Sequence, residues 1–109
     1  MLKRAYRLPL RKPLVSPQSA QTPVYFFKVA PNTLPHSRFG FIISKRIAGS
    51  SVLRNRARRL FHACIAGRLS RIKPGYDILF ITRKDPFSDK GASPCDIIAA
   101  ILKKQGLLT

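Results

Sequence analysis

Residues 38–68 constrain the fold most, because an apolar strand, a turn of small residues and an arginine-rich helix follow one another there without any acidic residue. Apolar positions recur along the helix at intervals of four, three and four residues, which predicts a face that packs against a core. These positions are Leu53, Ala57, Leu60 and Cys64. The five arginines between positions 52 and 68 must then project from the other faces of the same helix.

These arginines would be costly for an isolated helix. Arg54 and Arg58 lie four positions apart, and a like-charged pair at this spacing destabilises a helix by roughly 0.2–0.5 kcal/mol. Cations in the first turn also oppose the positive end of the helix dipole. Since the chain has no Glu to compensate, we expect the negative charge to come from a ligand, with backbone amides at the helix N-terminus as further phosphate donors. The helix is predicted to bind RNA phosphates, and a solvated basic face is the alternative.

The charge of the whole chain also favours a nucleic-acid partner. Its 109 residues include 21 Lys and Arg but only 4 acidic residues, all Asp, which gives a formal net charge of +17. No acid occurs before Asp77. With 45% hydrophobic residues, the chain can bury one core and is not a disordered basic tail. Such a surface is typical of proteins that bind nucleic acid or an anionic membrane.

Membrane and secreted classes fit the sequence less well. No apolar run approaches the roughly 18–20 residues that span a bilayer, and prolines with basic residues interrupt the N-terminus where a signal peptide would be apolar. The same prolines argue against the amphipathic helix of a transit peptide. Two cysteines, Cys64 and Cys95, suit neither a disulfide framework nor a zinc site. We therefore expect a cytoplasmic protein with no membrane partner.

Proline breakers and alternating apolar residues divide the chain into two parts. Residues 1–22 form a basic, Pro-rich N-terminal segment, extended or with a degenerate first helix. Residues 23–109 form a single RNA-binding domain. Its predicted elements are strands at 24–29, 38–44 and 76–82, the basic helix, and a C-terminal helix between Ser93 and Gly106. The first two strands are close enough in sequence to pair as an antiparallel hairpin.

No group of residues suggests catalysis by the protein itself. The four Asp are scattered, and neither histidine has a partner at metal-ligand spacing, so we predict no catalytic residue and no metal site. Phe26 and Lys28 instead alternate onto one face of the first strand, opposite Tyr25, Phe27 and Val29. An aromatic ring beside a cation on an open sheet face is suited to stacking on single-stranded RNA. Core packing of the ring is the alternative.

Over about residues 22–105 the chain resembles the protein component of bacterial ribonuclease P. The resemblance lies in Arg38-Phe-Gly-Phe-Ile-Ile-Ser44-Lys45-Arg46, in Arg54-Asn55-Arg56-Ala-Arg58-Arg59-Leu60, and in the stretch from Gly75 to Lys84. It implies an α/β (α+β) two-layer sandwich like domain 2 of ribosomal protein S5, with a small mixed sheet of about four strands and a C-terminal helix. It also implies that the basic helix joins neighbouring parallel strands by a left-handed crossover, although about 98% of such crossovers are right-handed.

The resemblance also implies a role as the non-catalytic protein subunit of a tRNA-processing endoribonuclease. A catalytic RNA, with Mg²⁺ bound mainly by that RNA, would remove the 5′ leader of precursor tRNA. The implied partners are ribonuclease P RNA and precursor tRNA, not DNA, and the protein would be monomeric apart from the RNA complex. The residues implied to contact the catalytic RNA are Lys45, Arg46, Arg54, Asn55, Arg56, Arg58 and Arg59. Phe26 and Lys28 would line the cleft that holds the leader.

Two departures from the family pattern affect these expectations. The family usually carries paired Phe residues on an N-terminal helix after an Arg-Leu, whereas here Arg7-Leu8 is followed by Pro9 and both rings are absent. The expected cleft wall is therefore weakened. The acid that usually follows the arginine motif is replaced near Ala63. Two other functions stay open on the sequence: a small ribosomal or other structural RNA-binding protein, and a DNA-binding repressor.

Overall fold

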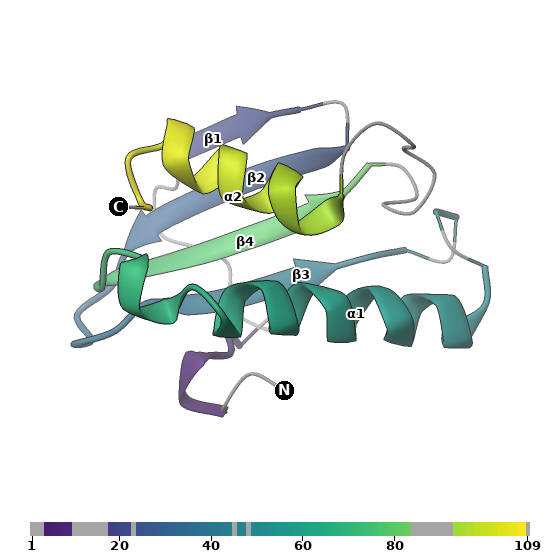
Figure 1. Cartoon of the computed structure of the whole chain (residues 1–109), viewed down its shortest axis with the longest axis horizontal. Helices are drawn as coiled ribbons and strands as arrows, with labels where there is room; N and C mark the ends of the chain where they lie inside the picture. The colour runs from purple at the N-terminus through teal and green to yellow at the C-terminus, as the bar shows by residue number, and fades with distance from the viewer. Residues whose placement is uncertain are drawn as a thin grey trace.

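A four-stranded sheet with two α-helices on one face forms the domain (Figure 1). This computed structural model describes residues 4–9, 18–22, 24–44, 46–47, 49–83 and 93–108, and the counts refer to these ranges. The strands are β1 (Gln18–Gln21), β2 (Tyr25–Pro31), β3 (Arg38–Ile42) and β4 (Tyr76–Thr82). The helices are α1 (Ser51–Ala66) and α2 (Pro94–Lys104), and two 3-10 turns are η1 (Arg4–Tyr6) and η2 (Leu69–Arg71).

The predicted hairpin between the first two long strands is wrong. The strand order is β1-β2-β4-β3, so β4 lies between β2 and β3. It pairs antiparallel with β2, where Phe27 faces Phe80, and parallel with β3, where Phe41 faces the same Phe80. The nearly continuous apolar run of β4 explains its place, because a central strand is paired at both edges and buries more of its surface.

The segment from β3 through α1 to β4 forms a left-handed crossover. In Figure 1 both helices lie in front of the sheet, β3 and β4 both run from left to right, and β4 lies above β3. When this view is turned so that the two strands point up, the connection through α1 moves from β3 to a strand on its left, which is the left-handed arrangement. The mixed sheet and the handedness implied by the family resemblance are thus confirmed. The likeness to domain 2 of ribosomal protein S5 stays a prediction.

Aromatic rings from both layers form the centre of the core. Phe80 packs edge-on against Phe27 and Phe61, with ring centroids 5.2 and 5.4 Å apart. Tyr25 is also fully buried, and this burial raises the pKa of its phenol to about 12. The predicted alternation of β2 is confirmed, because Tyr25, Phe27 and Val29 are buried while Phe26 and Lys28 are half-buried on the opposite face.

Helix α1 buries a face that differs in part from the predicted one. Ala57 and Cys64 are buried as expected, together with Phe61 and Ile65. Leu60 is partly buried against the core. Leu53 is 42% exposed, because the first turn of α1 extends beyond the end of β3 (Figure 1).

Helix α2 begins and ends as its sequence predicts. The Ser93 hydroxyl accepts a hydrogen bond from the Asp96 amide at 3.1 Å, Pro94 occupies the first turn, and Gly106 takes a left-handed φ of 74° after the helix. A disulfide between Cys64 and Cys95 joins α1 to α2, with the two Cα atoms 5.4 Å apart. The expectation that these cysteines do not suit a disulfide is wrong, because 31 positions separate them and only the packing of the two helices brings them together.

The described parts of the N-terminal segment lie at both edges of the sheet. Gln18–Gln21 pair with β2 as the edge strand β1. Arg7 forms a parallel bridge with Phe39 of β3, and the Leu8 amide donates to the Phe39 carbonyl at 2.8 Å. Residues 10–17 lie outside the described ranges.

Candidate nucleic-acid interface

Ser50 is the N-cap residue of α1. The Ser50 hydroxyl accepts from the amides of Val52 and Leu53 at 3.1 and 3.4 Å, as an N-cap residue does. Two of the first-turn amides predicted to bind phosphate therefore already have an acceptor. Any anion held by this end of the helix is bound mainly by side chains.

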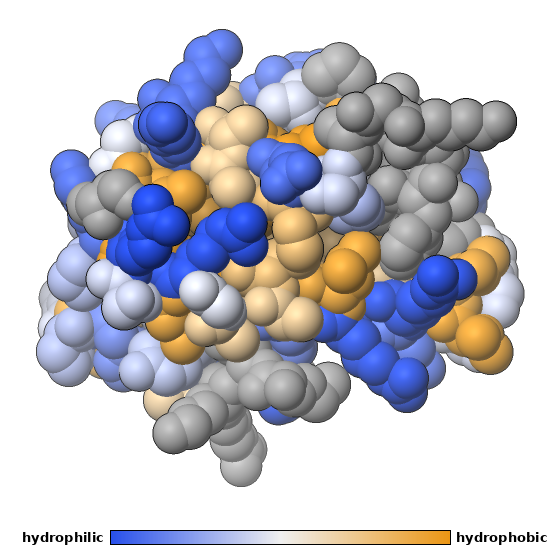
Figure 2. Space-filling model, in the orientation of Figure 1, coloured by the Kyte–Doolittle hydropathy of each residue, from blue (hydrophilic) through white to orange (hydrophobic). Residues whose placement is uncertain are grey.

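The structure brings most of the predicted RNA-binding side chains together on α1 and on the turn before it. Arg46, Asn55, Arg56, Arg58 and Arg59 are exposed, and Arg54 is half-buried. Lys45 lies outside the described residues. Figure 2 shows hydrophilic residues gathered over the N-terminal half of α1, next to an apolar group at its tip. Val52, at 72% exposure, and Leu53 are the large apolar side chains exposed in the first turn.

Two arginines of this surface are oriented by local hydrogen bonds. Arg58 Nη1 donates to Asn55 Oδ1 at 3.3 Å, and Arg54 Nη1 donates to the Gly49 carbonyl at 3.2 Å. Neither acceptor is an acid, so these bonds orient the guanidinium groups without neutralising them. Asn55, predicted to contact RNA, here positions Arg58.

His62 is a residue of this surface that the sequence analysis did not single out. Its ring is half-buried, and its buried Nδ1 finds no hydrogen-bond partner among the described residues. Burial lowers the pKa of His62, and the nearby cations Arg7 and Arg58 lower it further. A neutral ring therefore lies among cations, and its spacing of four residues from Arg58 on a helix was the available signal.

Phe26 and Lys28 lie on the sheet face opposite the helices. Lys28 Nζ is 5.7 Å from the centroid of the Phe26 ring, within the range of a cation–π contact. Phe26 pairs with Ile81 and Lys28 with Leu79 across the β2–β4 ladder. Each of these side chains is half-buried, so a ring and a cation are presented on an apolar floor.

An ion pair that the sequence analysis did not predict lies at one end of this sheet face. Arg38 makes a bidentate contact with Asp77, and Asn32 Nδ2 also donates to Asp77 Oδ1 at 2.8 Å. Burial would raise the pKa of Asp77, but the hydrogen bonds from Arg38 and Asn32 outweigh it and hold that pKa below its usual value. The first acid of the chain is thus committed to an internal pair.

The side chains of these surfaces are suited to binding a nucleic acid. Over the described part of the chain, no three His, Cys, Asp or Glu side chains gather where they could hold a metal ion. None of the helices described is long and apolar enough to cross a bilayer. Cationic forks, an amide and a stacking ring are groups that bind and orient a phosphate backbone and its bases.

Known proteins with similar sequences and folds share one description. A sequence family described as Ribonuclease P matches residues 14–102. A ribonuclease P protein component of Dehalococcoides mccartyi is 37% identical over 87 residues, which cover 80% of this chain and 70% of that protein. The corresponding component of Chloroflexus aurantiacus is 33% identical and is aligned over 98% of this chain and 82% of its own length. A solved mutant ribonuclease P protein of Staphylococcus aureus superposes with a TM-score of 0.81 at 22% identity, covering 96% of this chain and 92% of that one.

Proposed function

The chain belongs to the ribonuclease P protein family, and we propose that it holds the catalytic RNA on α1 and the 5′ leader of precursor tRNA on the open face of its sheet. As a ribonuclease P protein component, it is part of a tRNA-processing ribonuclease. The observation that carries the proposal is the set of exposed arginines on α1, a helix whose sequence contains no acid. Cations that have no acidic partner in their own helix are suited to neutralising the phosphates of a bound RNA.

In this proposal the RNA carries the chemistry. The side chains of the α1 surface are cations, which bind phosphate oxygens and repel a Mg²⁺ ion, and one amide, which would be a single ligand without a carboxylate beside it. We therefore place the Mg²⁺ mainly on the RNA and assign to Arg46, Arg54, Arg56, Arg58 and Arg59 the task of neutralising the RNA phosphates near it. Lys45 is assigned to the same task from its place in the sequence. Asn55 supports this task by orienting Arg58.

The leader is assigned to Phe26 and Lys28. The ring offers a stacking surface, and the ammonium group beside it pairs with a phosphate of the same single strand. Because the paired Phe residues of the family are absent from the N-terminal segment, the sheet face must supply more of the contact with the leader.

We also propose that the protein acts in the cytoplasm and is a monomer apart from the RNA complex.

Cleavage of precursor tRNA by the cognate catalytic RNA, at low Mg²⁺ and with or without the protein, tests this function. We expect the protein to raise the cleavage rate and to keep the cut at the mature 5′ end. An Arg58→Ala, Arg59→Ala double variant should lose most of the increase, whereas Lys103→Ala, Lys104→Ala on the last turn of α2 should keep it. Tight binding to ribosomal RNA without any effect on cleavage would favour the structural RNA-binding alternative.

A further inference from the structure

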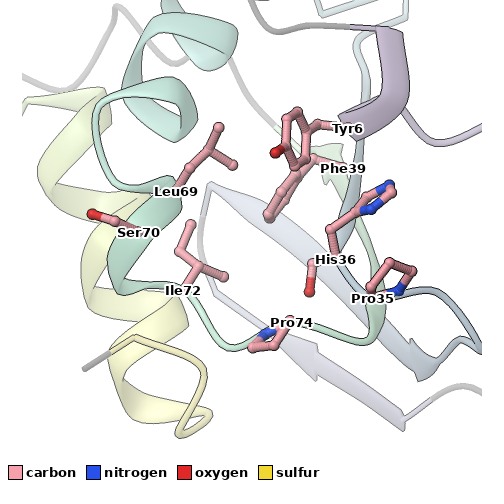
Figure 3. Close-up of a pocket in the computed structure, with 9 residues that line it drawn as sticks. Tyr6, Pro35, His36, Phe39, Leu69, Ser70, Ile72 and Pro74 are labelled. Carbon is pink, nitrogen blue, oxygen red and sulfur yellow. The ribbon is translucent and has the colours of Figure 1, made fainter.

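A cavity of about 490 Å³ opens between η1, the turn that precedes β3 and the η2 segment (Figure 3). Tyr6 and Phe39 lie together on one side of it, and His36, Leu69, Ile72 and Pro74 surround the remaining space. We propose that this cavity binds one unpaired base of the partner RNA. The proposal rests on the function above but uses none of the residues assigned there.

The cavity is separate from the sheet face assigned to the leader. Phe39, only 2% exposed, belongs to the core on the helix side of β3, as does Ile72. Its neighbours along the strand, Arg38 and Gly40, alternate onto the opposite side. A base in the cavity and a leader on Phe26 would therefore lie on different sides of the sheet.

Hydrogen bonds hold the walls in place without a ligand. His36 Nε2 lies 2.9 Å from the Ala5 carbonyl, and its ring meets the Tyr6 ring edge-on with centroids 5.1 Å apart. The Ser37 hydroxyl donates to the Lys73 carbonyl at 2.6 Å and accepts from the Tyr76 amide at 3.1 Å. The volume is within the range of pre-formed ligand sites, about 300–1,000 Å³.

The lining and its surroundings select the class of ligand. Its walls are apolar side chains, two hydroxyl-bearing serines and the rings of Tyr6 and His36, with no charged side chain among them. Exposed cations stand next to lining residues in the chain: Arg7 follows Tyr6, and Arg71 and Lys73 flank Ile72. A flat apolar group that carries a phosphate satisfies both features, and unpaired RNA bases are bound in this way by aromatic side chains.

Mononucleotides provide the direct test on the full-length protein. We expect UMP and AMP to shift the NMR amide signals of Tyr6, His36 and Leu69, and ribose 5-phosphate, which lacks a base, to leave them in place. Leu69→Trp should fill the cavity and abolish the shifts. The matched control Leu53→Trp, at the exposed far end of α1, should keep them. Equal shifts with ribose 5-phosphate would show that the base is not recognised and would overturn the proposal. Larger shifts with p-cresol, which mimics a tyrosine side chain, would overturn it in favour of a protein ligand.

Abasic substitution identifies which RNA supplies the base. Single unpaired nucleotides are replaced one at a time in the catalytic RNA and, in a second series, in precursor tRNA. Removal of the captured base should weaken binding of the RNA to the natural protein by about 5- to 150-fold. The same abasic RNA should bind Leu69→Trp as tightly as the intact RNA does. If that variant does not fold, Tyr6→Ala removes one wall and takes its place.

The two proposals fail in different ways. If no abasic substitution weakens binding to the natural protein more than to Leu69→Trp, while the protein still stimulates precursor-tRNA cleavage, the base-binding proposal is wrong and the proposed function stands. If mononucleotides bind in the cavity but cleavage is not stimulated, the base site stands and the proposed function is wrong.

Discussion

Arg38 and Asp77 face each other at the same register of the parallel β3–β4 pair and are joined by hydrogen bonds of 2.9 and 2.8 Å. These are the two strands that α1 connects. Asp77 is the first acid in the chain, and it alternates with the core residue Ile78, so it lies on the sheet face opposite α1. The ion pair therefore stabilises the strand–helix–strand unit from the face of the sheet that α1 does not cover.

Loss of the Arg38 side chain should destabilise the fold. Arg38→Ala leaves a largely buried carboxylate with Asn32 as its remaining side-chain donor, which we expect to cost about 1–3 kcal/mol of unfolding free energy. The estimate is moderate because the two side chains are 27% and 12% exposed. Urea unfolding measures it, with the exposed Arg46→Ala as the control for loss of one positive charge. Equal midpoints for the two variants would show that the pair contributes no stability.

The Cys64–Cys95 disulfide should make stability depend on redox state. A cross-link that spans 31 positions lowers the entropy of the unfolded chain and is expected to contribute about 3–4 kcal/mol. A thiol reductant should lower the melting temperature of the natural protein by this mechanism. The Cys64→Ala, Cys95→Ala double variant should melt at a lower temperature and be insensitive to the reductant. A reductant effect of the same size in both proteins would contradict the assignment.

His62 should make stability depend on pH below neutrality. Because burial lowers its pKa in the folded protein below the value of 6.5, the unfolded chain takes up the proton first as the pH falls. The contribution of His62 to the free energy of unfolding is therefore fully present above pH 6.5, and it is lost as the pH falls through 6.5 towards the pKa of His62 in the folded protein. Melting temperatures between pH 8 and pH 5 should show this loss in the natural protein and a smaller one in His62→Gln. A loss of the same size in His62→Gln would contradict this assignment.

The arginine surface should show in the salt dependence of RNA binding. Arg58→Ala and Arg59→Ala are each expected to weaken binding to the catalytic RNA and to reduce the slope of log K against log salt by about one unit per lost phosphate contact. Asn55→Ala should weaken binding less, because it releases Arg58 without removing its charge. Lys104→Ala is the charge-matched control. Unchanged slopes in both arginine variants would exclude this helix as a phosphate-binding surface.

Phe26 should discriminate between substrates that carry a leader and those that do not. Phe26→Ala removes the stacking ring, and loss of one stacked base costs about 1–3 kcal/mol. Affinity for precursor tRNA should therefore fall, while affinity for mature tRNA should hardly change. Both affinities are measured on the complex with the catalytic RNA. Equal losses for the two tRNAs would assign the ring to packing alone.

Local patterns in the sequence determined much of this protein. The limits of β4, the cap and Pro94 of α2 and the alternation of β2 all follow from spacing and from residue types whose preferences act over a few positions. The arginine helix follows in the same way, because exposed cations on a helix depend on its period and not on its neighbours. Most of the candidate RNA-binding residues could therefore be named before the fold was known.

Only the tertiary structure decided which distant elements meet. The insertion of β4 between β2 and β3, the Arg38–Asp77 pair and the Cys64–Cys95 bond each join positions at least 31 residues apart. The exposure of Leu53 depends on where the sheet beneath α1 ends, which the helical period does not encode. Such contacts are selected by the burial of the whole apolar surface at once, because pairing of strands and packing of helices are not properties of any single segment.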